Sequence, residues 1–254
     1  NHTFTRNPFG FVSKERGEKV MTRGEGACLV CGKPIIYFDK AKKMKCIMCH
    51  KTFESYASCE DGHFVCDECH AKKGIDMVME ECKNSTSKNP IVLLQKLMED
   101  PYIYMHGPEH HVMVGAVLLT AYHNCGGEID LDEALEEIKQ RGGQYPGGSC
   151  GLWGACGAAV STGMFMSILT KATPLTGKSW RMSNEMTAKA LEEIAKLGGP
   201  RCCKRNSFTA VKVAAEYVRE NMGIVMELPE KILCDFSAEN KQCLKKHCPY
   251  NPGK

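Results

Sequence analysis

The sequence predicts an α-dominated protein in which a small two-metal Cys/His domain, similar to a zinc finger, precedes a helical bundle. Between Cys28 and Cys69, cysteine and histidine recur in pairs at metal-ligand spacing, separated by short strand-like pieces. After residue 90, helix start and stop signals follow one another and strand signals are almost absent. The expected division is a loosely ordered leader at 1–24, a two-zinc module at 25–83 and a helical cysteine-rich domain at 90–254.

Composition narrows the class of protein. The chain has 254 residues, enough for one or two domains, and a net charge of only +3, which gives no whole-chain argument for nucleic-acid binding. Its 16 cysteines are far above normal usage, and their C-x-x-C spacing favours metal or redox chemistry over a disulfide framework. The first twenty residues lack an apolar signal-peptide core, and no run is long and apolar enough to span a membrane. We therefore expect a cytoplasmic protein with no membrane partner.

The first third of the chain carries the metal ligands. A C-x-x-C turn places two thiolates on one zinc ion, and four ligands complete a tetrahedral site, so eight ligands predict two zinc ions. Sequential pairing and interleaved pairing of these ligands both fit the spacing. Rubredoxin-type iron at the first two pairs is an alternative to zinc, and His70 is an alternative ligand to His63. The predicted ligands are Cys28, Cys31, Cys46, Cys49, Cys59, His63, Cys66 and Cys69.

The fragment CEDGHFVCDEC, which includes Cys59 and Cys69, resembles the central run of RING-type zinc fingers. A RING finger has another cysteine pair downstream, whereas here only Cys82 follows. The full RING pattern is absent, and ubiquitin-ligase chemistry is not predicted.

Helix signals follow in order after the polar stretch 83–89. Proline at the first turn, capping Asp or Ser side chains and closing Gly or Pro residues mark the helix ends. The expected helices run from Pro90 to Pro101, from Pro108 to Tyr122, from a cap at Asp130 through Ile138 with a stop at Gly142-Gly143, over 158–170, from a cap at Ser183 to Leu197, and over 206–222.

Two glycine-rich loops and the tail carry the remaining cysteine constellation. GGSCGLWGACGAA and GGPRCCKRNS each place two cysteines just before a helix, and a helix N-terminus stabilises a thiolate, so lowered thiol pKa values are predicted. We interpret the two loops and the tail as three walls of one site. An iron–sulfur cluster, a metal-free dithiol and buried structural thiols all remain open. The residues expected to ligate or react are Cys150, Cys156, Cys202 and Cys203, with Cys234, Cys243 and Cys248 as cofactor ligands in the tail.

Charged and aromatic residues complete this prediction. Arg201 and Arg205 flank the Cys202-Cys203 pair and are expected to hold a small anionic substrate. His110 is the best candidate for proton transfer among four clustered histidines, the others being His106, His111 and His123. Trp153 is interpreted as a core anchor rather than a substrate-facing ring.

Together these motifs carry two resemblances. CLVCG, CEDGHFVCDECH, HGPEHH, GGSCGLWGACGAA, GGPRCCKR and the final CPY resemble an uncharacterised cysteine-rich family of methanogenic archaea and anaerobic bacteria, some of whose members are fused to S-adenosylmethionine-dependent methyltransferases. The helical half is similar to the redox family named for its C-GCAxxG-C-C pattern, through Cys150, Cys156 and Cys202-Cys203. The resemblances imply a methyltransferase or a redox protein as partner.

The leading hypothesis is therefore a metalloprotein of anaerobic metabolism, with a structural zinc module and an iron–sulfur or redox site for electron, sulfur or one-carbon transfer. The alternative is a non-enzymatic adaptor that contacts nucleic acid or a protein through the zinc module and the basic stretch 40–51. The small net charge and the lack of interleaved aromatic residues count against nucleic acid.

Overall fold

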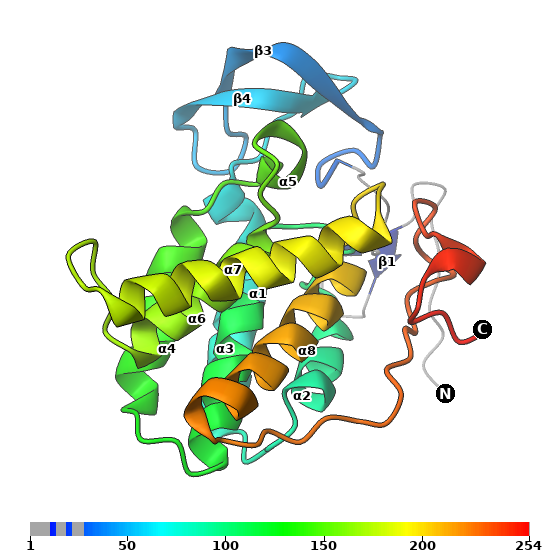
Figure 1. Ribbon diagram of the computed structural model, residues 1–254. Helices are drawn as coiled ribbons and strands as arrows, with labels where there is room; N and C mark the ends of the chain where they lie inside the picture. The colour runs from blue at the N-terminus through cyan, green and yellow to red at the C-terminus, as the bar shows by residue number, and fades with distance from the viewer. Residues whose placement is uncertain (1–10, 14–18, 22–27, 254) are drawn as a thin grey trace.

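The computed structural model describes residues 11–13, 19–21 and 28–253 of the chain. A small β-hairpin module lies on one end of a helical body (Figure 1). The predicted fold class is confirmed, because two Cys/His clusters precede a region built from helices. Most of the expected leader at 1–24 lies outside the described residues. Within it, β1 (Phe11–Ser13) pairs antiparallel with β2 (Lys19–Met21).

The module is built on one antiparallel hairpin, β3 (Ile35–Lys45) and β4 (Thr52–Cys59). Ile35 pairs with Cys59 at one end and Lys45 pairs with Thr52 at the other, with a register shift between Tyr37 and Lys42. One end of the hairpin therefore carries the Cys59 segment, and the connecting turn at the opposite end carries the second cysteine pair.

Helix α1 (Asp67–Asn84) joins the module to the helical body. Cys66 is its N-cap, while Val78 and Cys82 near its far end are fully buried in the hydrophobic core. The polar linker expected at 83–89 starts only after this helix, and Asn89 then caps the next helix by accepting the Ile91 and Val92 amides. The expected domain boundary thus falls in the last turn of a helix that belongs to both halves.

The centre of the helical body is α3, whose side chains are buried along nearly its whole length. It contacts α1, α4, α6 and α8, and the amide of Gly115 donates to Ser161 Oγ of α6 at 2.9 Å. Among the described residues, no helix is long and apolar enough to cross a bilayer. The elements after α1 are α2 (Pro90–Met98), α3 (Glu109–Asn124), α4 (Leu131–Gln144), α5 (Ser149–Leu152), α6 (Gly157–Leu169), α7 (Lys178–Leu197), α8 (Cys203–Met222) and a 3₁₀ turn at Lys245–His247.

Two expected helix boundaries are wrong. Helix α4 continues through Gly142 and Gly143 to Gln144, because Gly142 lies against α3, where an added Cβ would be 2.8 Å from the His111 carbonyl oxygen. Helix α7 starts at Lys178, so Ser183 lies inside it and donates to the Ser179 carbonyl instead of capping. At the end of α4, tertiary packing therefore outweighs the local stop signal.

Candidate functional site

The eight predicted ligands form two clusters in which one atom from each residue lies within 4.8 Å of the others. The pairing is interleaved: the first pair joins the third, and the second joins the fourth. The rubredoxin-type alternative is wrong, because its four cysteines are divided between the two clusters. The clusters are Cys28, Cys31, Cys59 and His63, and Cys46, Cys49, Cys66 and Cys69.

The backbone turns at the first two pairs explain why these sequences form metal knuckles. The amide of Cys28 donates to Lys33 O and the amide of Cys46 donates to Lys51 O, which closes each turn. The residue after each pair, Gly32 or His50, has a positive φ, 76° and 60° respectively. His50 therefore has a backbone role in the turn, at a conformation that non-glycine residues adopt uncommonly.

Sulfur spacing within the clusters fits a tetrahedral ion. The Sγ atoms of Cys31 and Cys59 are 3.8 Å apart, as are those of Cys49 and Cys66. Two thiolates ~2.3 Å from one tetrahedral zinc ion would be about 3.8 Å apart. Backbone amides also donate to the sulfurs, from Val30 to Cys28 at 3.4 Å and from the ligand His63 to Cys59 at 3.3 Å.

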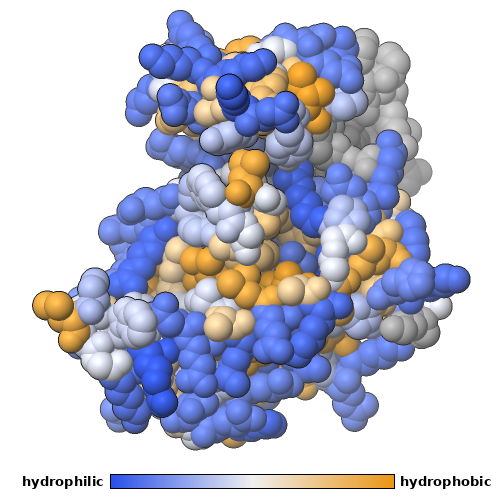
Figure 2. Space-filling view, turned by 45° about the horizontal axis from the view of Figure 1, so that its top comes forward, coloured by the Kyte–Doolittle hydropathy of each residue, from blue (hydrophilic) through white to orange (hydrophobic). Residues whose placement is uncertain are grey.

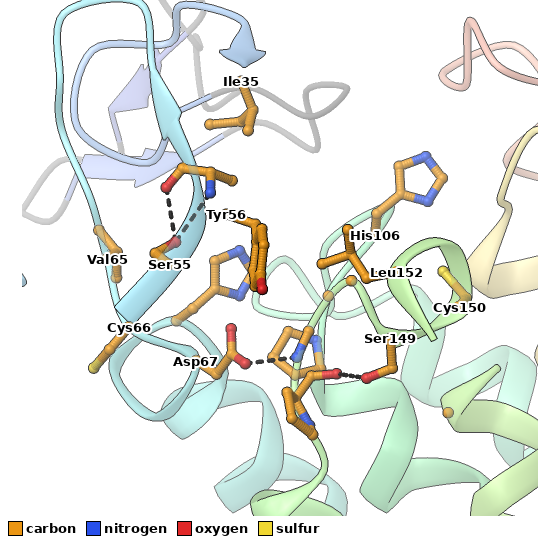
Figure 3. A pocket seen from close by; sticks show the side chains of 18 of the residues that line it. Ile35, Ser55, Tyr56, Val65, Cys66, Asp67, His106, Ser149, Cys150 and Leu152 are labelled. Atoms are coloured by element: carbon orange, nitrogen blue, oxygen red, sulfur yellow. Dashed lines mark hydrogen bonds between the residues drawn. The ribbon is translucent and has the colours of Figure 1, made fainter. Parts of the chain in front are cut away.

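A chamber of about 870 Å³ lies between the module and the helical body. Its lining comes from β3, β4, α1, the segment before α3, the start of α3, the α4–α5 loop, α5, the start of α6 and the start of α8. Figure 3 shows Tyr56, Asp67, His106, Cys150 and Leu152 around this space. The amide of Gly147 donates to Asp67 Oδ2 at 2.6 Å and so fastens the α4–α5 loop to α1.

Aromatic and aliphatic side chains are exposed where the chamber opens. Tyr56, Leu152 and Trp153 all line it, and Trp153 is 60% exposed. The interpretation of Trp153 as a core anchor is therefore wrong. Figure 2 shows the recess between the module at the top and the helical body below, with hydrophobic side chains exposed inside it.

A buried Glu–His pair stands at the inner side of the chamber. His110 Nδ1 lies 3.0 Å from Gly107 O and 3.4 Å from Glu109 Oε1, and Glu109 Oε2 lies 3.8 Å from His70 Nδ1 on the other side. Since carbonyl and carboxylate oxygens only accept, Nδ1 of His110 carries the proton and Nε2 is left as the acceptor. Burial and the Lys204 cation hold the pKa of His110 below its ordinary value, so the ring is neutral at pH 7.

Glu109 was not among the predicted site residues. It is fully buried, and burial alone would raise its pKa, but the His110 ring on one side and the His70 ring on the other hold it below the ordinary value. A Glu after a proline is common in the first turn of a helix, so the sequence carries no signal for this role. The other histidines have different surroundings. His111 Nδ1 lies 3.0 Å from Tyr145 O, and His123 is exposed near the end of α3.

Three predicted thiols line the chamber: Cys150, Cys156 and Cys203. Asn206 Nδ2 donates to Cys156 Sγ at 3.4 Å. The prediction of lowered thiol pKa values is wrong for Cys150 and Cys203. Burial raises the pKa of Cys150, and it raises that of Cys203 to about 12, outweighing nearby backbone amides and the Arg201 charge.

The two loops and the tail do not form the single site that the sequence predicted, because their cysteines line two separate cavities. Cys203 lines the chamber, whereas its neighbour Cys202 lines a separate apolar cavity of about 10 Å³ beside the tail. The pKa of Cys202 is also raised by burial. We call this second site the tail pocket; its cysteines are Cys202, Cys234, Cys243 and Cys248.

Hydrogen-bond donors and buried cations surround the tail pocket. Cys202 Sγ accepts from the Arg205 amide and from Asn240 Nδ2, both at 3.4 Å, and Cys243 Sγ accepts from the Lys245 amide at 3.3 Å. Lys204 and Arg205 both line the pocket and are 0% and 2% exposed. Arg205 donates to the carbonyls of Gly198 and Pro200 and does not line the chamber, while Arg201 does.

A family model described as a family of unknown function (DUF5714) matches residues 78–251. The match covers the helical body and the tail, including the tail pocket and every chamber residue contributed by α3, α5, α6 and α8. Comparison with curated proteins and with solved structures found no match. The matched segment is more than half of the chain, which therefore belongs to this family of unknown function, DUF5714.

Proposed function

We propose that this protein is a zinc-containing redox protein, in which the tail pocket binds an iron–sulfur cluster and the chamber binds a small substrate beside its thiols. The observation that carries the proposal is the convergence of four cysteines from two distant segments, α8 and the tail, on one enclosed apolar pocket. A reducing cytoplasm, as expected from the sequence, would keep these thiols free for metal.

The spacing of the tail-pocket thiols favours a cluster over a single ion. The sulfurs of each N-terminal cluster lie within 4.8 Å of one another, as one tetrahedral ion requires, and the four tail-pocket sulfurs do not form such a group. The four thiolates of a [4Fe–4S] cluster each ligate a different iron, and so they span a wider set. The tail must move outward to admit the cluster, because the cavity between these cysteines is only about 10 Å³. Such an anionic group is stabilised by hydrogen bonds to the ligand sulfurs and by nearby buried cations. The sulfurs of Cys202 and Cys243 accept hydrogen bonds from backbone amides, and Lys204 and Arg205 are the buried cations.

Zinc is the proposed metal of the two N-terminal clusters. Seven thiols and one imidazole in tetrahedral groups of four are the donors of structural zinc sites. Both clusters are complete with protein ligands, so their role is to hold the hairpin and α1 together and thereby form one wall of the chamber.

Within the chamber the chain itself offers acid–base and thiol groups. His110 Nε2 is positioned to accept a proton, and Glu109 stabilises the imidazolium that results. When bound in the tail pocket, a cluster would supply one-electron chemistry. The two sites are joined by the peptide bond between Cys202 and Cys203, one residue facing each.

Anaerobic reconstitution with iron and sulfide tests the proposal. The wild type should gain a visible chromophore and iron in addition to its zinc. Cys234→Ser and Cys248→Ser should lose most of the iron and keep zinc and helical content. Cys125→Ser is the matched control, because Cys125 lies at the end of α3 outside both sites. A wild type that takes up no iron, or serine variants that take up as much as the control, would contradict the cluster.

A further inference from the structure

The first turn of α6 reaches the chamber without a capping side chain. The first backbone bond of this helix runs from the Val160 amide to Cys156 O, and no side chain of Cys156 caps the turn. The first amides of a helix have no acceptor within it and carry a partial positive charge. The first turn contains no acidic residue, and Gly157 and Ala158 both line the chamber. A buried helix end of this kind calls for an acceptor.

A cation lies in the same chamber. Arg201 lines it, with its guanidinium 5.8 Å from the ring centroid of Tyr37 on β3. Among the described residues, no carboxylate forms an ion pair with Arg201. Its charge acts on the chamber groups, since it contributes to the lowered pKa of His106 and opposes the rise at Cys150.

Two buried imidazoles point to a ligand independently of the helix end. His110 is 1% exposed and its Nε2 has no hydrogen-bond partner in the described structure, and His106 is 9% exposed with neither ring nitrogen hydrogen-bonded there. Both residues line the chamber. Because Nδ1 of His110 carries the proton, its Nε2 calls for a partner that donates a hydrogen.

The acidic side chains that line the chamber all lie on the module side. Asp67 Oδ2 accepts the Gly147 amide, and Glu109 does not line the chamber but lies behind it, between the His70 and His110 rings, with neither carboxylate oxygen hydrogen-bonded in the described structure. Glu54 and Glu68 line the chamber from β4 and α1 and are exposed. The inner side, formed by α6, Arg201 and the start of α8, is therefore where negative charge is favoured.

We propose that this inner side binds a small organic anion, a carboxylate or a phosphate, that carries a hydroxyl, thiol or amine hydrogen next to its charged group. The charged group is held by the α6 amides and Arg201, and the neighbouring X–H group donates to His110 Nε2. This inference rests on the proposed function in taking the chamber as the substrate site, but it requires no cluster in the tail pocket.

Calorimetric titration of the zinc-loaded full chain tests the proposal with glycolate, acetate and phosphate as probes. Acetate lacks only the hydroxyl of glycolate, so glycolate should bind about 10-fold more tightly if His110 accepts its hydrogen. Comparison of glycolate with phosphate identifies which charged group the site prefers, and saturable binding of either supports the anion site.

Variants separate the two recognition elements. Arg201→Gln should weaken the binding of glycolate and of phosphate about 10-fold, because a charge-assisted hydrogen bond is lost. Arg219→Gln, at the exposed far end of α8, should bind like the wild type. His110→Phe should abolish the advantage of glycolate over acetate while acetate binding persists.

Three results would overturn the inference: no saturable binding by the wild type up to about 10 mM, equal affinity of wild type and Arg201→Gln, or equal weakening in Arg219→Gln. Zinc content and melting temperature measured on each variant ensure that lost binding does not reflect lost fold. Because iron is not needed, a negative result here leaves the reconstitution experiment to decide on the cluster separately.

Discussion

Close contacts between single residues fix the geometry at the inner side of the chamber. A Cβ added at Gly157 would lie 2.1 Å from Cδ2 of the His111 ring, so only glycine fits where α6 begins beside α3. Gly157→Ala should destabilise the fold by about 1–3 kcal/mol, since either the ring or the helix must move. Gly143→Ala is the matched control: nothing lies within 4 Å of its added Cβ, and alanine is favoured inside a helix.

Chemical denaturation of both variants measures this difference. Gly143→Ala should be as stable as the wild type or more stable by up to about 1 kcal/mol. Equal stabilities for Gly157→Ala and Gly143→Ala would mean that the contact between His111 and α6 is not tight.

His106 should make the free energy of unfolding depend on pH. Burial, aided by the charges of Arg201, His110 and Lys204, lowers the pKa of His106 to about 3. In the unfolded chain its pKa is ~6.5, so below about pH 6.5 the unfolded state binds a proton that the folded state does not. Stability is unaffected at higher pH and is lost as the pH falls toward the folded value, by at most about 1.4 kcal/mol per pH unit from this group.

His106→Gln removes this titration and leaves the other acid-sensitive groups in place. The free energy of unfolding, measured from pH 7 to pH 5, should fall less steeply in the variant than in the wild type. Parallel curves would show that His106 takes up a proton in the folded protein as readily as in the unfolded chain.

The sequence predicted the metal ligands well because their spacing is local. A C-x-x-C pair can be recognised without knowledge of the fold, but the second pair that shares its metal ion cannot. Sequential and interleaved pairing have the same local sequence pattern, and the register of the β3–β4 hairpin decides between them. The roles of Glu109, Cys202 and Cys203 could not be predicted for the same reason. Burial of a carboxylate and opposite directions of adjacent side chains arise only from tertiary packing.

Among the elements, α1 couples the metal module to the core. Its N-terminal end carries the ligands Cys66 and Cys69, and Val78 and Cys82 farther along are buried among the helices. We expect the N-terminal end to depend on metal for its order, whereas the other end is held by hydrophobic packing, which does not need metal.

Removal of metal by a chelator should therefore open only part of the molecule. Amide hydrogen exchange should accelerate across β3, β4 and the first turns of α1, while α3 and α8 remain protected. Uniform acceleration that includes α3 would contradict this division and would show that the helical body also needs metal to stay folded.

Helix positions were predicted from start and stop signals, and most elements lie where those signals placed them. The errors have a physical cause. Gly142 reads as a stop signal but serves the close approach of α3 and α4, and Ser183 reads as a cap but lies inside α7. Helix α1 was not predicted, because its first turn carries a ligand pair and the segment was assigned to the metal module, and helix α5 was not predicted because four residues carry no periodic pattern.

At the scale of the whole molecule, the chamber exists only because two differently built halves face each other. The metal module contributes β3, β4 and the start of α1, and the helical body contributes thiols, imidazoles and Arg201. The sequence predicted both halves and many of the lining residues, but a space between halves has no sequence signature. The tail returns past α8 and places three of its cysteines beside Cys202, which forms the second site.

The central claim, two zinc ions in the module and an iron–sulfur cluster in the tail pocket, is tested most directly by X-ray absorption at the zinc and iron edges of anaerobically reconstituted protein. Seven thiolates and one imidazole over two ions predict an average zinc shell dominated by sulfur with a minor nitrogen contribution. The iron edge should show sulfur ligands and iron–iron scattering. Zinc bound mainly by oxygen, or iron without a neighbouring iron, would contradict the account.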